Sequence, residues 1–227
     1  MGGTAMYPLK RLTILCGHYG SGKTNVAVNI ATELKKTRDT VTVADLDIVN
    51  PYFRTKDSAA YFEEQGIRLI CSAYANSNVD IPALPQEMYA LTDDRSMTAV
   101  LDIGGDDRGA LVLGRLAPKI LAEDDYEMLM VINRYRPLTR DAASTLEVMA
   151  EIEYAGGIRF TGLVNNSNLG ASTTAEDVLA SSEYAEEIAR LSGLPVVMTS
   201  VRADLAPAVE GKMPRVFPLT LQKNKFL

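Results

Sequence analysis

Short runs of β-branched and other apolar residues alternate along the chain with longer stretches of helical periodicity. Polar, Gly or Pro residues bound most of these runs, as is typical of strands. They predict seven strands, at residues 12–16, 40–44, 67–71, 98–103, 128–132, 160–164 and 196–200. Strands that alternate with helices are typical of strand-helix-strand units. The sequence therefore predicts an α/β fold with a single doubly wound, mostly parallel sheet and helices on both faces.

Apolar positions at helical spacing indicate how two of the helices pack on this sheet. After the first strand, Val26, Ile30 and Leu34 recur every four residues and form one apolar stripe. A second stripe consists of Leu138, Ala142, Leu146 and Met149. Residues 174–191 are predicted to form one further helix, which ends at Gly193 because glycine commonly caps helix C-termini.

The chain shows no internal boundary. It has 227 residues, of which 47% are hydrophobic, so it can fill one core. No Pro- or Ser-rich linker and no repeat of fixed period divides it. We expect one domain over residues 1–227, with residues 1–8 as a flexible start and 212–227 as a C-terminal tail.

Charge and cysteine content exclude several function classes. The formal net charge is −6, so the whole protein offers no positive field for nucleic acid. Cys16 and Cys71 fit neither a disulfide framework nor a metal motif and are predicted to be reduced core residues. No window approaches the ~20 apolar residues of a spanning helix, and residues 219–227 are too short and irregular for a membrane-binding helix. We therefore expect a cytoplasmic protein without nucleic-acid or membrane partners.

One motif carries the functional prediction. Directly after the first strand the chain reads Gly17-His18-Tyr19-Gly20-Ser21-Gly22-Lys23-Thr24. This segment fits the phosphate loop G-x-x-x-x-G-K-[S/T], in which main-chain N–H groups and a helix N-terminus hold a phosphate chain. Lys23 is expected to neutralise the β- and γ-phosphates, and the Thr24 hydroxyl to bind Mg²⁺. A dinucleotide fingerprint needs a different glycine spacing, G-x-G-x-x-G, and does not fit.

Acidic residues follow two of the other predicted strands. Asp45 and Asp47 alternate along an extended segment, so both are expected to face one region of space. The alternative for either is that it caps the following turn. Asp102 and Gly105 end the fourth strand as a D-x-x-G segment. This segment predicts that Asp102 binds the magnesium shell and that the Gly105 N–H senses the γ-phosphate.

Taken together, these residues resemble the MinD/ParA class of P-loop ATPases. Residues 162–166, which end in Asn165-Asn166, and residues 209–214, which contain a Gly-Lys-Met-Pro turn, also match the class. The resemblance covers most of the chain and implies the same doubly wound sheet, with Mg-ATP as the ligand. It further implies that Asp47 positions or deprotonates the attacking water and that Asp45 supports magnesium. Asn166 or Asn165 would then read the adenine base.

The chain departs from this class at the start of the phosphate loop. His18 and Tyr19 stand where the class has a signature lysine and a glycine, and that lysine reaches across a nucleotide-sandwich homodimer. The departure puts the activating contact of such a dimer in question. His18 is either a pH-dependent substitute for the lysine or an ordinary loop histidine. The segment 47–53 also differs from the usual class segment.

Three functions stay open at the level of the sequence. A switch ATPase would present its nucleotide-dependent loops to an unidentified protein partner or a second subunit. A kinase, ligase or synthetase would pass the γ-phosphoryl group to a metabolite, with Arg134, Arg136 and Arg140 as the acceptor site; these arginines are otherwise a mobile lid or a solvated helix start. A sensor would bind ATP without cleaving it. ATP is favoured over GTP because the N-K-x-D guanine motif is absent.

Overall fold

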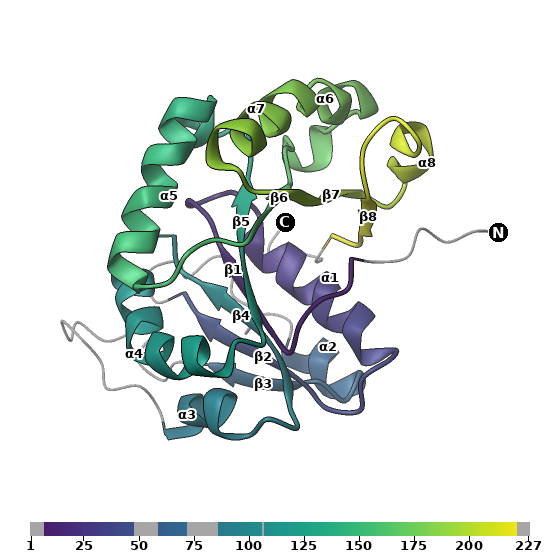
Figure 1. Cartoon of the computed structure of the whole chain (residues 1–227). Coiled ribbons are helices and arrows are strands. Elements are labelled where there is room, and N and C mark those ends of the chain that lie inside the picture. The colour runs from purple at the N-terminus through teal and green to yellow at the C-terminus, as the bar shows by residue number, and fades with distance from the viewer. Residues whose placement is uncertain (1–6, 48–58, 72–85, 106, 222–227) are drawn as a thin grey trace.

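Eight parallel strands form one sheet in the described part of the computed structural model, which comprises residues 7–47, 59–71, 86–105 and 107–221 (Figure 1). Our expectations for residues 1–6, 48–58, 106 and 222–227 lie outside this part. The strand order is β3-β2-β4-β1-β5-β6-β7-β8. The strands are β1 (Leu12–Cys16), β2 (Val41–Leu46), β3 (Arg68–Cys71), β4 (Thr98–Ile103), β5 (Tyr126–Ile132), β6 (Gly162–Asn165), β7 (Val196–Arg202) and β8 (Val216–Leu219).

Helices cover both faces of the sheet. They are α1 (Lys23–Lys35), α2 (Ala59–Glu64), α3 (Gln86–Asp93), α4 (Asp107–Glu123), α5 (Ala142–Gly156), α6 (Ala175–Leu179), α7 (Ser182–Ser192) and α8 (Ala206–Val209), with short 3₁₀ turns η2 (Pro137–Thr139) and η3 (Gly170–Ser172). The helices α3, α4, α5 and α7 share one apolar core, whereas α1 and α2 pack in the core of the opposite face. This arrangement confirms the predicted doubly wound α/β fold. No helix in the described ranges has the length and apolar character needed to cross a bilayer.

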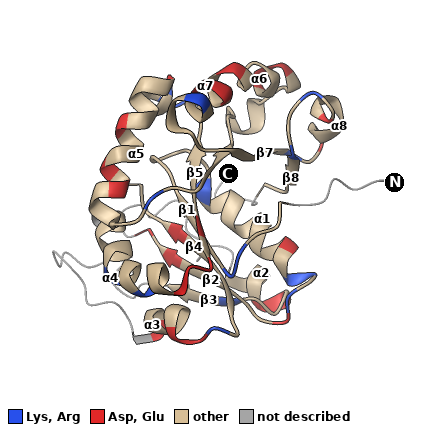
Figure 2. Cartoon of the chain, viewed as in Figure 1, with Lys and Arg blue, Asp and Glu red and all other residues tan. Residues whose placement is uncertain are grey.

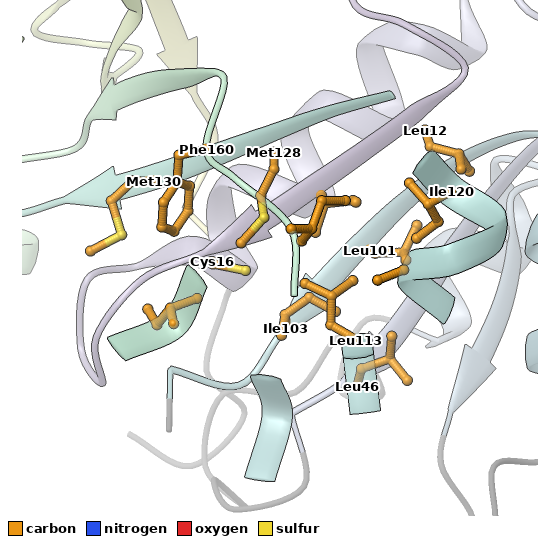
Figure 3. Packing of buried hydrophobic residues seen from close by; sticks show 14 of the residues in the cluster. Leu12, Cys16, Leu46, Leu101, Ile103, Leu113, Ile120, Met128, Met130 and Phe160 are labelled. Atoms are coloured by element: carbon orange, nitrogen blue, oxygen red, sulfur yellow. The ribbon is translucent and has the colours of Figure 1, made fainter. Parts of the chain in front are cut away.

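The larger core lies between the sheet and α4, as Figure 3 shows for Leu101, Ile103 and Leu113. These three side chains are fully buried. Burying such a side chain stabilises the fold by roughly 1.5–3 kcal/mol. Cys16 packs in the same core, and burial raises the pKa of its thiol, so it behaves as an apolar side chain.

All seven predicted strands are present, and their bounds differ from the predicted ones by no more than two residues. The prediction missed β8, which pairs with β7 at the edge of the sheet. This strand is short and contains Pro218, and an edge strand tolerates proline because one side of its backbone needs no ladder partner. Part of the expected tail 212–227 therefore belongs to the sheet.

Two helix predictions differ from the structure. The single helix expected over residues 174–191 is broken into α6 and α7 at Ser181, whose hydroxyl donates to Val178 O at 2.6 Å. The predicted C-cap at Gly193 is confirmed, with a left-handed φ of 73°. Leu138 lies in η2 and is exposed, because α5 begins only after Asp141, whose side chain accepts from Ser144 N at 2.9 Å.

The topology places a site at the carboxyl ends of the central strands. The strand β1 lies between β4 and β5, and the chain winds in opposite directions along the sheet from this point. In open parallel sheets, ligands bind beyond the carboxyl ends of the strands at such a switch point. Acidic residues mark the carboxyl ends of β2 and β4 here (Figure 2).

Candidate functional site

The loop between β1 and α1 is shaped by its glycines. Gly20 and Gly22 have φ angles of 77° and 85°, a left-handed conformation that glycine adopts without steric cost. A Cβ on Gly17 would lie 2.5 Å from Val131 O, so only glycine fits beside β5. The loop therefore curls directly into the N-terminus of α1, as the phosphate-loop motif predicts.

The two side chains that open α1 are both bonded to buried carboxylates. Lys23 Nζ donates to Asp47 Oδ2 at 2.7 Å, and both side chains are only 6% exposed. Thr24 Oγ1 donates to Asp102 Oδ2 at 2.6 Å. The structure thus brings together four predicted site residues from α1, from β4 and from the end of β2.

Asp45 lies beside this group. It is the register partner of Asp102 in the parallel pair of β2 and β4, and it is buried. Asp45 Oδ1 accepts from Asp47 N at 3.1 Å, so Asp45 also fulfils the turn-capping alternative considered from the sequence. Three carboxylates and one lysine therefore share one buried region.

The closeness of these groups shifts the pKa values of Asp102 and Lys23. Burial raises the pKa of Asp102 to about 7 against the opposing charge of Lys23, and the Asp45 carboxylate adds to the rise. Burial alone would lower the pKa of Lys23, but the carboxylates of Asp102 and Asp47 outweigh it and raise the pKa. The site holds a charged lysine among carboxylates that lie too close for all of them to ionise easily.

Two buried polar atoms near the loop have no hydrogen-bond partner among the described residues: Asp102 Oδ1 and Ser21 Oγ. A buried carboxylate oxygen without a donor is costly, and such atoms often face a ligand. Within the described ranges, no three His, Cys, Asp or Glu side chains are grouped to hold a metal on their own. A cation at Asp102 would therefore need ligands from a bound molecule or from water.

Gly105 lies against the start of the loop. A Cβ on Gly105 would lie 2.0 Å from Gly17 O and 2.9 Å from His18 Cα, so no other residue fits this approach. The D-x-x-G segment and the phosphate loop are therefore in contact, as their proposed roles require. His18 is half-buried, and its Nδ1 lies 3.2 Å from Tyr19 O, whereas the Tyr19 side chain is exposed.

The two asparagines at the end of β6 have different surroundings. Asn165 Nδ2 donates to Ser181 Oγ at 2.8 Å, and its Oδ1 accepts from Ser167 N, so its amide joins β6 to the start of α7. Asn166 Nδ2 donates to Ser21 O at 2.7 Å, and its Oδ1 accepts from Ser200 Oγ at 2.8 Å. Asn165 is therefore bonded to the start of α7, and Asn166 is a brace between the phosphate loop and β7. Contact of either residue with a base stays a prediction.

A cleft extends from the phosphate loop toward the ends of β6 and β7. It encloses about 450 Å³ of empty space that includes open solvent. Its lining consists of Gly22, Asn25, Asn166, Ser167, Asn168, Gly170, Thr173, Val178, Ser200, Val201, Arg202, Leu219 and Leu221. Asn165 is not among them. Among the described residues, this lining has asparagine, hydroxyl and apolar groups and the guanidinium of Arg202, but no carboxylate.

Two supporting residues, Ser200 and Asn133, were not predicted from the sequence. Ser200 holds Asn166, and Asn133, at the end of β5, is fully buried with its Oδ1 accepting from Tyr135 N and Asn168 N. Neither belongs to a recognisable motif. Their only signal is a position at the carboxyl end of a predicted strand, which marks a candidate without giving its role.

Comparisons with known proteins support the fold. No protein-family model and no curated protein matches the sequence. Among solved structures, the chain is similar to the cell division protein FtsY from Thermotoga maritima, with 19% identity, a TM-score of 0.55, and coverage of 85% of this chain and 63% of that one. The chloroplast FtsY from Physcomitrella patens gives 17% identity, a TM-score of 0.57, and coverage of 86% and 60%. FtsY from Mycoplasma mycoides is 15% identical with a TM-score of 0.51, and the match covers 85% of this chain and 59% of that one.

The chain thus spans less than two thirds of each of these structures. At such low identity the similarity shows the fold alone, a doubly wound α/β sheet. Membership in the MinD/ParA class stays a prediction.

Proposed function

We propose that this protein binds a magnesium–nucleoside triphosphate, preferably ATP, and hydrolyses it slowly as a nucleotide-dependent switch. The observation that carries the proposal is the joined set of Lys23–Asp47 and Thr24–Asp102 at the end of a glycine loop that opens a helix. In a P-loop, the lysine neutralises phosphate oxygens and the hydroxyl binds the cation. The chain has both groups in place.

The residues around Asp102 fit a magnesium ion. Asp102 has one buried oxygen without a described partner, and its other oxygen already contacts the Thr24 hydroxyl. Mg²⁺ is usually bound through one or two carboxylates plus substrate phosphates and water, which agrees with the lack of a larger ligand cluster in the described part. Thr24 and Asp102, supported by Asp45, would hold it. The ion would supply positive charge to the β- and γ-phosphates.

The contact between Lys23 and Asp47 is expected to break when the substrate binds. Lys23 Nζ donates to Asp47 Oδ2 at 2.7 Å, so it contacts the carboxylate that would accept a proton. A phosphate chain in the loop attracts Lys23 and releases Asp47. Asp47 then orients a water and accepts its proton while the water oxygen forms a bond to the γ-phosphorus and the bond to the bridging oxygen breaks. Turnover is expected to be slow until a partner orders the surrounding loops.

The cleft supports adenine over guanine. The N–H groups of guanine usually donate hydrogen bonds to a carboxylate, and no carboxylate lines the described cleft. Asn166 and Asn168 both line the cleft. Asn166 is bonded to the phosphate loop, whereas the Asn168 side chain is bonded, among the described residues, only within its own segment, to Asn166 O and Gly170 N, and is our candidate for base contact. The fold does not choose the base, since one fold hosts many functions.

The alternative of a small-molecule kinase loses its acceptor site. Arg134 donates to Ala180 O, Arg140 is paired with Asp141 at 3.4 Å, and only Arg136 contacts the phosphate loop. The three arginines therefore contact three different groups, which favours the switch over this alternative. A switch requires a binding partner that recognises its nucleotide state, either an unidentified protein or a second copy of the chain. We place the protein in the cytoplasm, where Mg-ATP is available.

The test measures binding and cleavage separately. Calorimetry with a slowly hydrolysed ATP analogue and its GTP counterpart, each with Mg²⁺ and then with EDTA, should show magnesium-dependent binding with ATP preferred. A single-turnover assay with labelled ATP should release phosphate. Lys23→Ala should weaken binding by about 100-fold or more, since a charge-assisted contact to phosphate is lost. Lys36→Ala, an exposed lysine at the other end of α1, is the matched control and should bind normally.

Three results would contradict parts of this proposal. Absent binding in the wild type, or unchanged binding in Lys23→Ala, would remove the nucleotide site. Binding without any phosphate release would make the protein a sensor instead of a hydrolase. Tighter binding of the GTP analogue would overturn the base assignment. The mass measured by light scattering with ADP and with the ATP analogue would show whether the binding partner is a second copy of the chain.

A further inference from the structure

Arg136, in the segment between β5 and η2, lies on the phosphate loop. Its Nε donates to Gly20 O at 2.7 Å across 116 positions of sequence. A Cβ on Gly20 would lie 3.2 Å from Arg136 Nε and 3.9 Å from its Cζ, so the guanidinium is seated directly over this glycine. Gly20 belongs to the stretch whose N–H groups would hold phosphate. The guanidinium therefore lies at the edge of the phosphate site.

The backbone around Arg136 is held from several sides. Arg136 N donates to Asn133 O at 3.2 Å, and Thr139 N donates to Arg136 O at 3.1 Å. Thr139 Oγ1 donates to Asn133 O at 2.8 Å, and Tyr135 OH donates to Asp177 O at 2.8 Å. A side chain on so well-supported a segment is preorganised, which lowers the entropic cost of placing its charge at a ligand.

Arg136 differs from its basic neighbours in what it contacts. Arg134 donates to Ala180 O and lies 5.7 Å from the Tyr135 ring, and Arg140 pairs with Asp141. Among the described residues, Arg136 forms no ion pair, and no acceptor contacts its terminal nitrogens. A guanidinium with two free donor groups suits a phosphate, which it binds through paired hydrogen bonds.

The charge balance of the site calls for such a cation. Asp45, Asp47 and Asp102 are all buried at the carboxyl ends of the strands, and Lys23 is the buried lysine that faces them. A triphosphate would add several negative charges to this group. Even with a divalent cation, a further positive charge beside the loop would stabilise the bound phosphates and the charge that develops during their transfer.

We propose that Arg136 is a triphosphate-contacting residue, whose terminal guanidinium nitrogens donate to the β- and γ-phosphates of a nucleotide held in the loop while Nε remains on Gly20 O. This inference rests on the proposed function and deepens it. Arg136 supplies from within the chain the positive charge that stabilises the phosphate undergoing transfer. It requires no second subunit.

The experiment compares Arg136→Ala and Arg136→Lys with the matched control Arg140→Ala. Calorimetry with ADP and with a slowly hydrolysed ATP analogue, both with Mg²⁺, should show that Arg136→Ala weakens the triphosphate at least about 10-fold more than the diphosphate. The single-turnover rate should fall by about 100-fold or more, as when an arginine is removed from phosphoryl transfer. Arg136→Lys should recover part of the affinity and little of the rate, because lysine lacks the fork of donors.

Arg140→Ala should match the wild type in each measurement. Equal weakening of ADP and the ATP analogue in Arg136→Ala, or a lowered melting temperature with unchanged nucleotide binding, would overturn the inference and make Arg136 a brace for Gly20. A normal single-turnover rate in Arg136→Ala would also overturn it. A wild type that binds neither nucleotide would remove the proposed function itself, whereas wild-type binding with an unaffected Arg136→Ala would remove only this inference.

Discussion

The two sides of the site are built from different chemistry. At the ends of β1, β2 and β4, buried charges face one another: Lys23 contacts Asp47, and Thr24 contacts Asp102. At the ends of β6 and β7, neutral groups are bonded in a closed network, in which Asn166 joins the loop to Ser200. The first side leaves a buried Asp102 oxygen without a described partner, whereas both ends of the Asn166 amide are bonded.

This difference indicates how each side responds to a ligand. Buried charges that contact one another are expensive to separate, and an ionic ligand can replace one of the partners. A satisfied neutral network has little to gain from rearrangement and keeps its shape. We therefore expect the charged side to change its contacts when phosphate binds and the neutral side to act as a fixed wall for the nucleoside.

The largest expected effect tests the charged side. Asp47→Asn should lower the single-turnover rate by about 100- to 10,000-fold, the contribution usual for a general base. Affinity for the ATP analogue should be kept or rise, because Lys23 no longer has to leave a carboxylate. Rapid-quench kinetics and calorimetry measure the two quantities, with the exposed Asp39→Asn as control. Normal turnover in Asp47→Asn would show that Asp47 only balances Lys23.

A smaller effect tests the neutral side. Asn166→Ala removes the bonds to Ser21 O and Ser200 Oγ, although Ser200 Oγ keeps a bond to Asn165 O. A buried group left unpaired costs about 1–3 kcal/mol. Binding of ADP and of magnesium pyrophosphate should therefore weaken alike, by about 10-fold, since the loop loses its brace. Asn168→Ala should weaken ADP and leave pyrophosphate unchanged. If Asn166→Ala spares pyrophosphate, Asn166 reads the base and the neutral side is not a fixed wall.

A buried carboxyl group at the opposite end of the sheet should make the stability depend on pH. Glu127 is buried at the start of β5 and accepts from Lys10 N at 3.0 Å and from Thr13 Oγ1 at 3.3 Å. Burial, which outweighs these bonds, raises its pKa from the ordinary 4.5 to about 7. The folded chain therefore retains a proton between about pH 4.5 and 7 that the unfolded chain loses, so stability falls as pH rises through this window.

Glu127→Gln removes this dependence. The free energy of unfolding of the wild type should fall relative to the variant by on the order of 2–3 kcal/mol from pH 5 to pH 8. Urea unfolding across this range measures the difference, with the exposed Glu151→Gln as control. Parallel pH profiles for the wild type and Glu127→Gln would show that Glu127 is ionised in the fold and stabilised by its donors.

Local pattern was enough to predict the framework of the site. Apolar runs predicted seven strands, and the glycine spacing predicted the loop. Both signals can be recognised because each lies within a few consecutive residues. The pattern missed β8, a short edge strand containing Pro218, whose place depends on its pairing with β7. It joined α6 and α7 into one helix, whereas Ser181 at the break donates to the nearby Val178 O and accepts from the distant Asn165.

From the amino-acid pattern alone, an α/β sheet with a phosphate-loop motif and with acidic residues after two other strands could be predicted. Which side chains meet there depends on the folded arrangement: Asp47 contacts Lys23, Asn166 contacts the phosphate loop, and Arg136 lies over Gly20. The physical reason is distance along the chain. Hydrophobic period and turn chemistry act over a few residues, whereas these contacts join segments 24 to 145 positions apart and depend on how the strands are ordered in the sheet.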